Sequence, residues 1–280
     1  MVIIADIKRL FLLFGLLLTF LPLSPTQGGL LSFGCKTLLN PTKLFPQILK
    51  GAGQVADDHV YDLGRGFNGK ASDKLLMKTV LGEVAKLPHK ARVGTYLRGL
   101  AEAGEISTKE ADDIFFRLQN VPRLADRLKL VYESGVQFRA GYLWEVRTAA
   151  GWERLGVKVL DMSTPYRLAQ PVAGQSKGDV DLLIKSAGKK YLVECKSYSM
   201  ETLGKLGGRE KILTQIDKYK STASELGAEQ TIIVCLQGQI DDLTLRAVRQ
   251  KKAIIGFCEK DPKNFEELDK MLRQILVQLP

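Results

Sequence analysis

The spacing of apolar residues along the chain changes about halfway through. Between residue 71 and about residue 155, apolar residues recur every three or four positions, which is typical of amphipathic α-helices. Ser107 begins a Ser-Thr-Lys-Glu sequence, a capping-box pattern that marks a helix start. We therefore predict a small helical region of about four helices over residues 71–135, followed by a further helix over 137–155.

Beyond residue 155, short apolar runs alternate with further helical patterns. Some of these runs are continuous, as in Thr-Ile-Ile-Val-Cys at residues 231–235, which is typical of strands that are buried on both faces. Strands are expected at 156–160, 179–184, 191–196, 231–235 and 253–257, and helices at 209–226, 241–250 and 264–279. The two central strands should form a hairpin that turns around Gly188. We expect residues 163–177 to be a loop that shapes a cleft. This alternation predicts an α/β domain over residues 136–280, with at least partly parallel pairing.

The first 27 residues differ from the rest of the chain. Lys8 and Arg9 precede an apolar run over residues 10–21, and two prolines follow it. This run is short for a membrane span and typical of the hydrophobic part of a signal peptide, although an uncleaved anchor fits as well. We expect the protein to be secreted or membrane-anchored, and cytoplasmic if this segment is not a signal. Residues 28–70 are rich in Gly, Pro, Asn and Thr and predict a linker or irregular structure.

Charge narrows the range of partners. The chain has 280 residues with a formal net charge of +10, and such a surface favours a polyanion, either nucleic acid or an anionic membrane. The four cysteines have no metal-like spacing, and His59 lies far in sequence from His89, which argues against a zinc site.

The predicted hairpin carries the candidate chemistry. Asp181 lies in its first strand, and Glu194 and Lys196 lie on one face of its second strand, because side chains alternate along a strand. Two carboxylates and the intervening main-chain carbonyl of Cys195 would suit a hard divalent cation. Lys196 could orient or deprotonate the attacking water. Asp179 is an alternative first acid, and a solvated surface pair is the alternative interpretation of Glu194 and Lys196.

These residues resemble the signature of the PD-(D/E)XK nucleases, in which an acid on one strand precedes an apolar strand that ends in (D/E)-x-K. Here the two pieces are Gly178-Asp-Val-Asp181 and Leu192-Val-Glu194-Cys-Lys196. Val180 stands where the family name has proline. The resemblance covers about residues 136–260 and implies a restriction-endonuclease-like core, a mixed sheet flanked by helices, with Mg²⁺ or Mn²⁺ held by Asp181, Glu194 and Cys195. Both the Holliday-junction-resolvase-like branch and the secreted toxin branch fit.

The resemblance also implies two helper residues. Members of the family often carry a glutamate on the helix before the first strand, and Glu145 matches it. The alternative is an ordinary ion pair between Glu145 and Arg147 or another neighbour. On the helix after the hairpin, Gln215 and Tyr219 resemble a Gln-x-x-x-Tyr element whose glutamine contacts the catalytic centre or the DNA backbone. The alternative is a polar surface pair.

We therefore expect a magnesium-dependent endonuclease that hydrolyses nucleic acid, with DNA favoured as the substrate. One alternative is a secreted bacterial toxin that cuts tRNA and has a cognate immunity protein. Others are a catalytically inactive nucleic-acid-binding or anchored scaffold, and an interaction protein that works through its helical region. Family members often pair subunits, so a homodimer is a further expectation, and residues 1–27 could contact a membrane.

Overall fold

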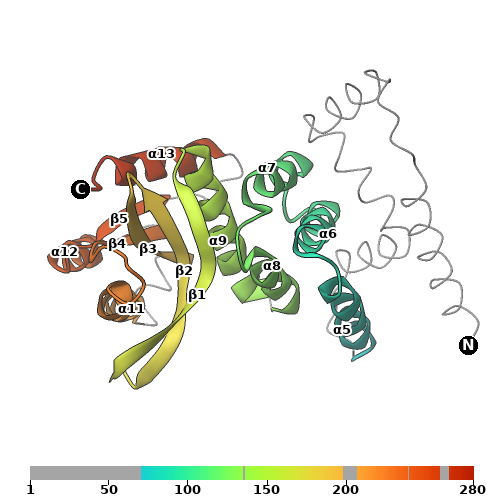
Figure 1. The fold of residues 1–280 in the computed structure, drawn as a ribbon, viewed down its shortest axis with the longest axis horizontal. Helices are drawn as coiled ribbons and strands as arrows, with labels where there is room; N and C mark the ends of the chain where they lie inside the picture. The colour runs from blue at the N-terminus through green and yellow to red at the C-terminus, as the bar shows by residue number, and fades with distance from the viewer. Residues whose placement is uncertain (1–70, 135, 198–206, 239, 259–264) are drawn as a thin grey trace, which may run out of the picture. The chain divides into compact units, whose positions relative to one another are not determined.

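The chain forms an α/β fold in which an N-terminal helical region precedes a five-stranded mixed sheet with flanking helices (Figure 1). The structure is a computed structural model, and it describes residues 71–134, 136–197, 207–238, 240–258 and 265–280. The predicted signal or anchor at 1–27 and the predicted linker at 28–70 lie outside these residues. Among the described helices, none combines the length and the apolar character that a membrane crossing needs.

The helical predictions are confirmed. The helices before the sheet are α5 (Ala71–Ala85), α6 (His89–Glu102), α7 (Thr108–Leu118), α8 (Leu124–Glu133) and α9 (Val136–Arg154). Ser107 caps α7, and its hydroxyl oxygen accepts a hydrogen bond from the main-chain N–H of Glu110 at 3.1 Å. This cap satisfies one of the N–H groups that a helix start leaves without a partner.

The predicted strands and later helices are also found, with shifted ends. The strands are β1 (Lys158–Val172), β2 (Gln175–Ser186), β3 (Lys189–Ser197), β4 (Ile232–Gln237) and β5 (Ile254–Cys258), in that order across the sheet. The pairs β1–β2 and β2–β3 are antiparallel, and the pairs β3–β4 and β4–β5 are parallel. The helices are α11 (Gly208–Ala223), α12 (Asp242–Gln250) and α13 (Phe265–Leu276).

The prediction of a loop at residues 163–177 is wrong. These residues belong to β1 and β2, which continue as a hairpin and turn at Ala173 and Gly174, both with positive φ (50° and 75°). Buried Tyr166 and Leu168 alternate with exposed residues, which is the period of a strand. The segment also contains two prolines, which this strand tolerates because β1 lies at the edge of the sheet.

The two faces of the sheet pack against different helices. On one face, α9 covers residues such as Leu182, Val193 and Cys235, and the Nε1–H of Trp144 donates to the carbonyl of Cys235 at 3.0 Å. This core continues without a break into α5–α8 and α13. On the other face, α11 packs its Ile216 over residues such as Leu192.

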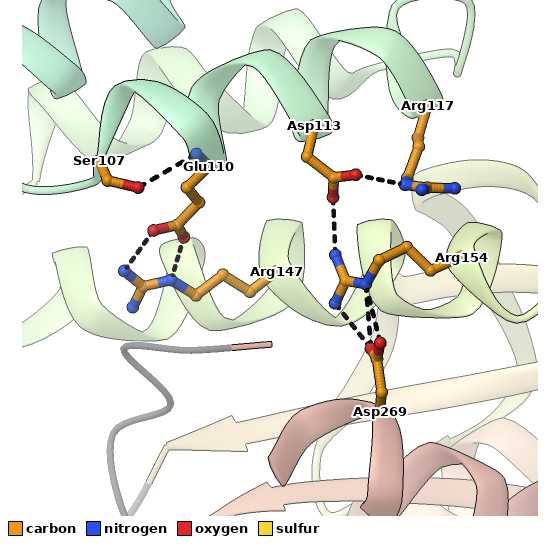
Figure 2. Close-up of polar contacts among 7 residues, drawn as sticks. All are labelled: Ser107, Glu110, Asp113, Arg117, Arg147, Arg154 and Asp269. Atoms are coloured by element: carbon orange, nitrogen blue, oxygen red, sulfur yellow. Dashed lines mark hydrogen bonds and ion pairs between the residues drawn. The ribbon is translucent and has the colours of Figure 1, made fainter. Parts of the chain in front are cut away.

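Ion pairs join α7 to α9, as Figure 2 shows. Glu110 of α7 accepts from Nε of Arg147 at 2.6 Å, and Asp113 accepts from Nη1 of Arg154 at 2.7 Å. Arg154 also binds Asp269 of α13 at 2.8 Å. The side chains of both arginines are largely buried, so these pairs are shielded from water and fix α7 and α13 on α9.

Candidate active site

The site forms where β2 and β3 separate. Their regular pairing ends at Leu182 and Val193, and beyond this point the carboxylate of Asp181 fills the gap. Its Oδ2 accepts a hydrogen bond from the main-chain N–H of Cys195 at 2.8 Å. The hairpin turn that sets this register is Ala187-Gly188, both with positive φ (48° and 85°), as in the type I′ turns that favour two-residue hairpins.

Glu194 and Lys196 lie at the end of β3, next to Asp181. The side chain of Glu194 is 1% exposed and forms an ion pair with Lys196, whose side chain is 26% exposed. Both follow Leu192 on the face that α11 covers, whereas the thiol of Cys195 points into the core on the α9 side. The ion pair therefore joins a buried carboxylate to an amine that solvent can reach.

The main chain of Cys195 is directed toward Asp181. The N–H and the C=O of one strand residue point to the same side of the strand. Because the N–H of Cys195 donates to Asp181, its carbonyl faces that side as well. The expected third oxygen ligand therefore lies on the same side of β3 as the carboxylate of Asp181.

Tyr219 of α11 fixes the backbone of β2 at this point. Its hydroxyl accepts from the N–H of Asp181 at 3.0 Å and donates to the carbonyl of Asp179 at 3.2 Å. Burial, followed by the charges of Asp181 and Glu194, raises the pKa of Tyr219 well above its ordinary value. The side chain of Asp179 is exposed, so of the two candidate acids it is Asp181 that the structure brings to Cys195.

Gln215 lies one helical turn before Tyr219 and is half-buried. Its Nε2 donates to the hydroxyl of Tyr166 at 3.4 Å, and the ring of Tyr166 meets that of Tyr219 edge-on, with 6.1 Å between centroids. Burial, partly offset by this hydrogen bond, raises the pKa of Tyr166, and the charges of Glu194 and Asp181 contribute. Gln215 thus borders the site through Tyr166, a residue that the sequence analysis did not single out.

Glu145 of α9 approaches the same site from inside the core. It is 7% exposed, and its Oε2 lies 2.8 Å from Nε of Arg127, which is also 7% exposed. Arg147, the partner suggested by sequence, binds Glu110 instead. Sequence reasoning missed Arg127, although it lies between Leu124, Leu128 and Val131 on the apolar face of α8, where a charge is unusual.

Three carboxylates and two cations therefore share one largely buried site. They are Glu145, Asp181 and Glu194, with Arg127 and Lys196. Burial, followed by the charge of Glu194, raises the pKa of Asp181 to about 7. Burial, followed by the charge of Asp181, raises the pKa of Glu145 well above its ordinary range. When all five are charged, the site carries one excess negative charge, which a proton or a cation can neutralise.

The donor set for a metal is small. Within the described ranges, no three His, Cys, Asp or Glu side chains are arranged as a complete metal site. Asp181 and Glu194 supply two carboxylates, and the carbonyl of Cys195 supplies a main-chain oxygen. Two carboxylates completed by water and substrate oxygens are a common arrangement for Mg²⁺, which seldom has a full shell of protein ligands.

Comparison with known protein families, with characterised proteins and with solved structures finds no match to this chain. Function is therefore inferred from the fold and from the site.

A separate hollow of about 840 Å³ lies between β5, α12 and α13, with Phe257 and Met271 in its lining, and contains none of the five charged residues.

Proposed function

We propose that this protein is a metal-dependent nuclease of the PD-(D/E)XK type, which hydrolyses phosphodiester bonds of nucleic acid. The observation that supports it most is the hydrogen bond between Asp181 and the N–H of Cys195. This contact brings the acid of one strand beside the Glu-x-Lys end of the next, as the motif requires. The mixed sheet between α9 and α11 agrees with the core of that family.

The residues present fit Mg²⁺ or Mn²⁺. Asp181, Glu194 and the carbonyl of Cys195 would hold the ion, because such hard cations prefer oxygen ligands. Burial, followed by the charge of Glu194, raises the pKa of Asp181, and the positive charge of a divalent cation would favour the ionised carboxylate. When bound, the metal would polarise the phosphoryl oxygen and acidify a bound water.

The other side chains act around this centre. Lys196 is held by Glu194 and reaches solvent, so its amine can orient the attacking water and offset the charge that builds up on the phosphate. Gln215 positions Tyr166 beside the carboxylates. Glu145, held by Arg127, adds a carboxyl group behind Asp181 that can take up or release a proton.

The substrate that we favour is DNA. The proposed partners are therefore nucleic acid and, if the enzyme is a dimer, a second copy of the chain. Cleavage of tRNA would instead support the secreted toxin alternative, with an immunity protein as a partner. Binding without cleavage would support an inactive scaffold.

The test is cleavage by the full chain. Wild type, Glu194→Gln and Lys196→Ala are offered plasmid DNA, single-stranded DNA and tRNA with Mg²⁺, Mn²⁺ or EDTA. Lys189→Ala is the matched control, since Lys189 lies exposed at the other end of β3, 4.0 Å from Glu229. We expect metal-dependent cutting by wild type and by the control, and a loss of at least about a hundredfold in the two site variants.

Circular dichroism shows whether each variant is folded. Cutting that survives both site substitutions would mean that the active site lies elsewhere. A wild-type chain that cuts none of the three substrates with either metal would contradict the proposed activity.

A further inference from the structure

The β1–β2 hairpin continues well beyond the rest of the sheet. β3 pairs with β2 only between Leu182 and Ser186, so the remainder of β2 is bonded to β1 alone. Residues 165–179 therefore form a two-stranded ribbon, which Figure 1 shows projecting from the sheet. We call these residues the arm.

The arm carries a pair of like charges that lie opposite one another on its two strands. Arg167 and Lys177 are directly opposite one another on the two strands, and both are exposed. No Asp or Glu occurs from residue 162 to residue 178, and neither side chain has a carboxylate partner among the described residues. The acid that lies nearest to Lys177 in the sequence is Asp179, two residues further along β2 and opposite Pro165 at the base of the arm. Like charges directly opposite each other destabilise a sheet, so an anionic ligand would relieve a cost that is built into this pair.

One side of the arm is attached to the body of the protein. Tyr166 and Leu168 are buried in the α11-side core, and Val172 packs against it. Near the tip, the amine of Lys218 on α11 donates a hydrogen bond to the side chain of Gln175. The arm is therefore held in place, while the side that carries Arg167 and Lys177 remains open to a partner.

The arm begins at the candidate active site. Lys177 precedes Asp181 by four residues on β2, which is roughly 13 Å along an extended strand. Tyr166, which faces Gln215 across the site, is the neighbour of Arg167 on β1. A polyanion bound along the open side of the arm would therefore contact the same strand that carries Asp181.

We propose that the arm binds duplex DNA through the major groove, with Arg167 and Lys177 on the phosphates. The major groove of B-form DNA admits a two-stranded β-ribbon, whereas that of A-form RNA is too deep and narrow for side chains to read. The exposed Gln170 and Ser176 near the tip can hydrogen-bond to base edges. This inference rests on the proposed nuclease function and narrows its substrate to duplex DNA.

The test measures binding in EDTA, where metal-dependent cleavage does not occur. Fluorescence anisotropy compares the full-length wild type with the double variant Arg167→Ala/Lys177→Ala on a labelled DNA duplex, at several salt concentrations. The control is Lys158→Ala/Lys185→Ala, which removes an exposed cross-strand pair of lysines from the other end of the same two strands. Lys185 also lies four residues from Asp181, so the two variants match in charge, exposure and distance along the strand.

We expect the arm variant to lose roughly tenfold or more in affinity, and its log–log salt slope to become shallower by about two, since each phosphate contact contributes about 0.9. The control should keep the wild-type slope. Wild type should prefer duplex DNA to duplex RNA of equal length, and the arm variant should lose that preference.

Equal losses in the two variants, equal binding of DNA and RNA duplexes, or no binding of wild type to duplex DNA would each overturn the proposal. The assay is separate from catalysis. A chain that binds through its arm but cuts nothing with Mg²⁺ or Mn²⁺ would contradict the proposed nuclease and leave the arm as a DNA-binding element.

Discussion

Asp181 and Cys195 lie on neighbouring strands, and the carboxylate of the first accepts the main-chain N–H of the second at 2.8 Å. The contact holds an acid at the point where β2 and β3 separate, in a site that already contains Glu194. Its environment determines how the protein should respond to pH, to metals and to substitution.

The first prediction concerns pH. The pKa of Asp181 rises from its ordinary 3.8 to about 7, so the folded protein binds a proton there that the unfolded chain releases above about pH 4. The stabilisation is complete below pH 4 and is lost as the pH rises through 7, up to about 4 kcal/mol in total. Urea unfolding in EDTA across this range should therefore show a slope that Asp181→Asn reduces.

Asp241 changes stability in the opposite direction, because its hydrogen bond to Thr244 in the cap of α12 lowers its pKa. The informative quantity is thus the difference between wild type and Asp181→Asn at each pH. Parallel curves for the two proteins would show that Asp181 titrates normally.

The second prediction concerns metal binding without any activity measurement. At pH 8, Mn²⁺ or Mg²⁺ should raise the melting temperature of wild type, because ligand binding to the folded state stabilises it by about 2.7 kcal/mol at a hundred times the Kd. Glu194→Gln should remove most of this shift. The shift should also weaken toward pH 5, where protons compete for the carboxylates. A shift that is equal in Glu194→Gln would place the metal elsewhere.

The third prediction concerns the buried pair Arg127 and Glu145. Arg127→Met should destabilise the protein by about 3–5 kcal/mol at pH 8, because it leaves the buried carboxylate of Glu145 without its ion-pair partner. The double variant Arg127→Met/Glu145→Gln should recover most of that loss. The single variant should also recover as the pH falls, since Glu145 can then be protonated. Chemical denaturation of wild type, the two single variants and the double variant measures the coupling energy between Arg127 and Glu145. Additive changes in the free energy of unfolding would contradict the prediction.

The fourth prediction concerns Gly178. A Cβ at this position would lie 2.6 Å from the hydroxyl oxygen of Tyr166 and 2.8 Å from the ring carbon that bears it. Gly178→Ala should therefore displace Tyr166, weaken its contact with Gln215 and cost about 1–3 kcal/mol. Gly82→Ala on α5 is the control, because its Cβ would meet nothing within 4 Å, and alanine is the better helix former. Equal shifts of the denaturation midpoint in Gly178→Ala and Gly82→Ala would contradict the predicted clash with Tyr166.

The fifth prediction concerns thiol reactivity. Cys195, Cys235 and Cys258 are buried, and burial raises the pKa of each thiol, that of Cys258 to about 11. In a Cys35→Ser chain, iodoacetamide at pH 8 should label none of them until the protein is unfolded, because only an exposed thiolate reacts quickly. Rapid labelling of the folded chain would show that this core opens.

The sequence predicted the helices and strands whose apolar pattern can be recognised within a single short segment. Continuous apolar runs marked β4 and β5, and the alternation around Gly188 marked the hairpin that bears Asp181 and Glu194. The extension of β1 was missed although Tyr166 and Leu168 alternate with exposed residues, because proline is rare within strands and weakens the strand pattern here. Arg127 was missed for another reason: its partner Glu145 lies on a different helix, and a contact between distant segments leaves no periodic signal.

Arg154 has a consequence for how the chain can be shortened. Its guanidinium joins Asp113, from the helices before the sheet, to Asp269, near the carboxyl end. A chain that started at residue 136 would expose the apolar side of α9 and leave this arginine with half of its partners. Limited proteolysis should accordingly yield one resistant fragment that begins before α6 and retains α13, with no smaller piece that folds by itself.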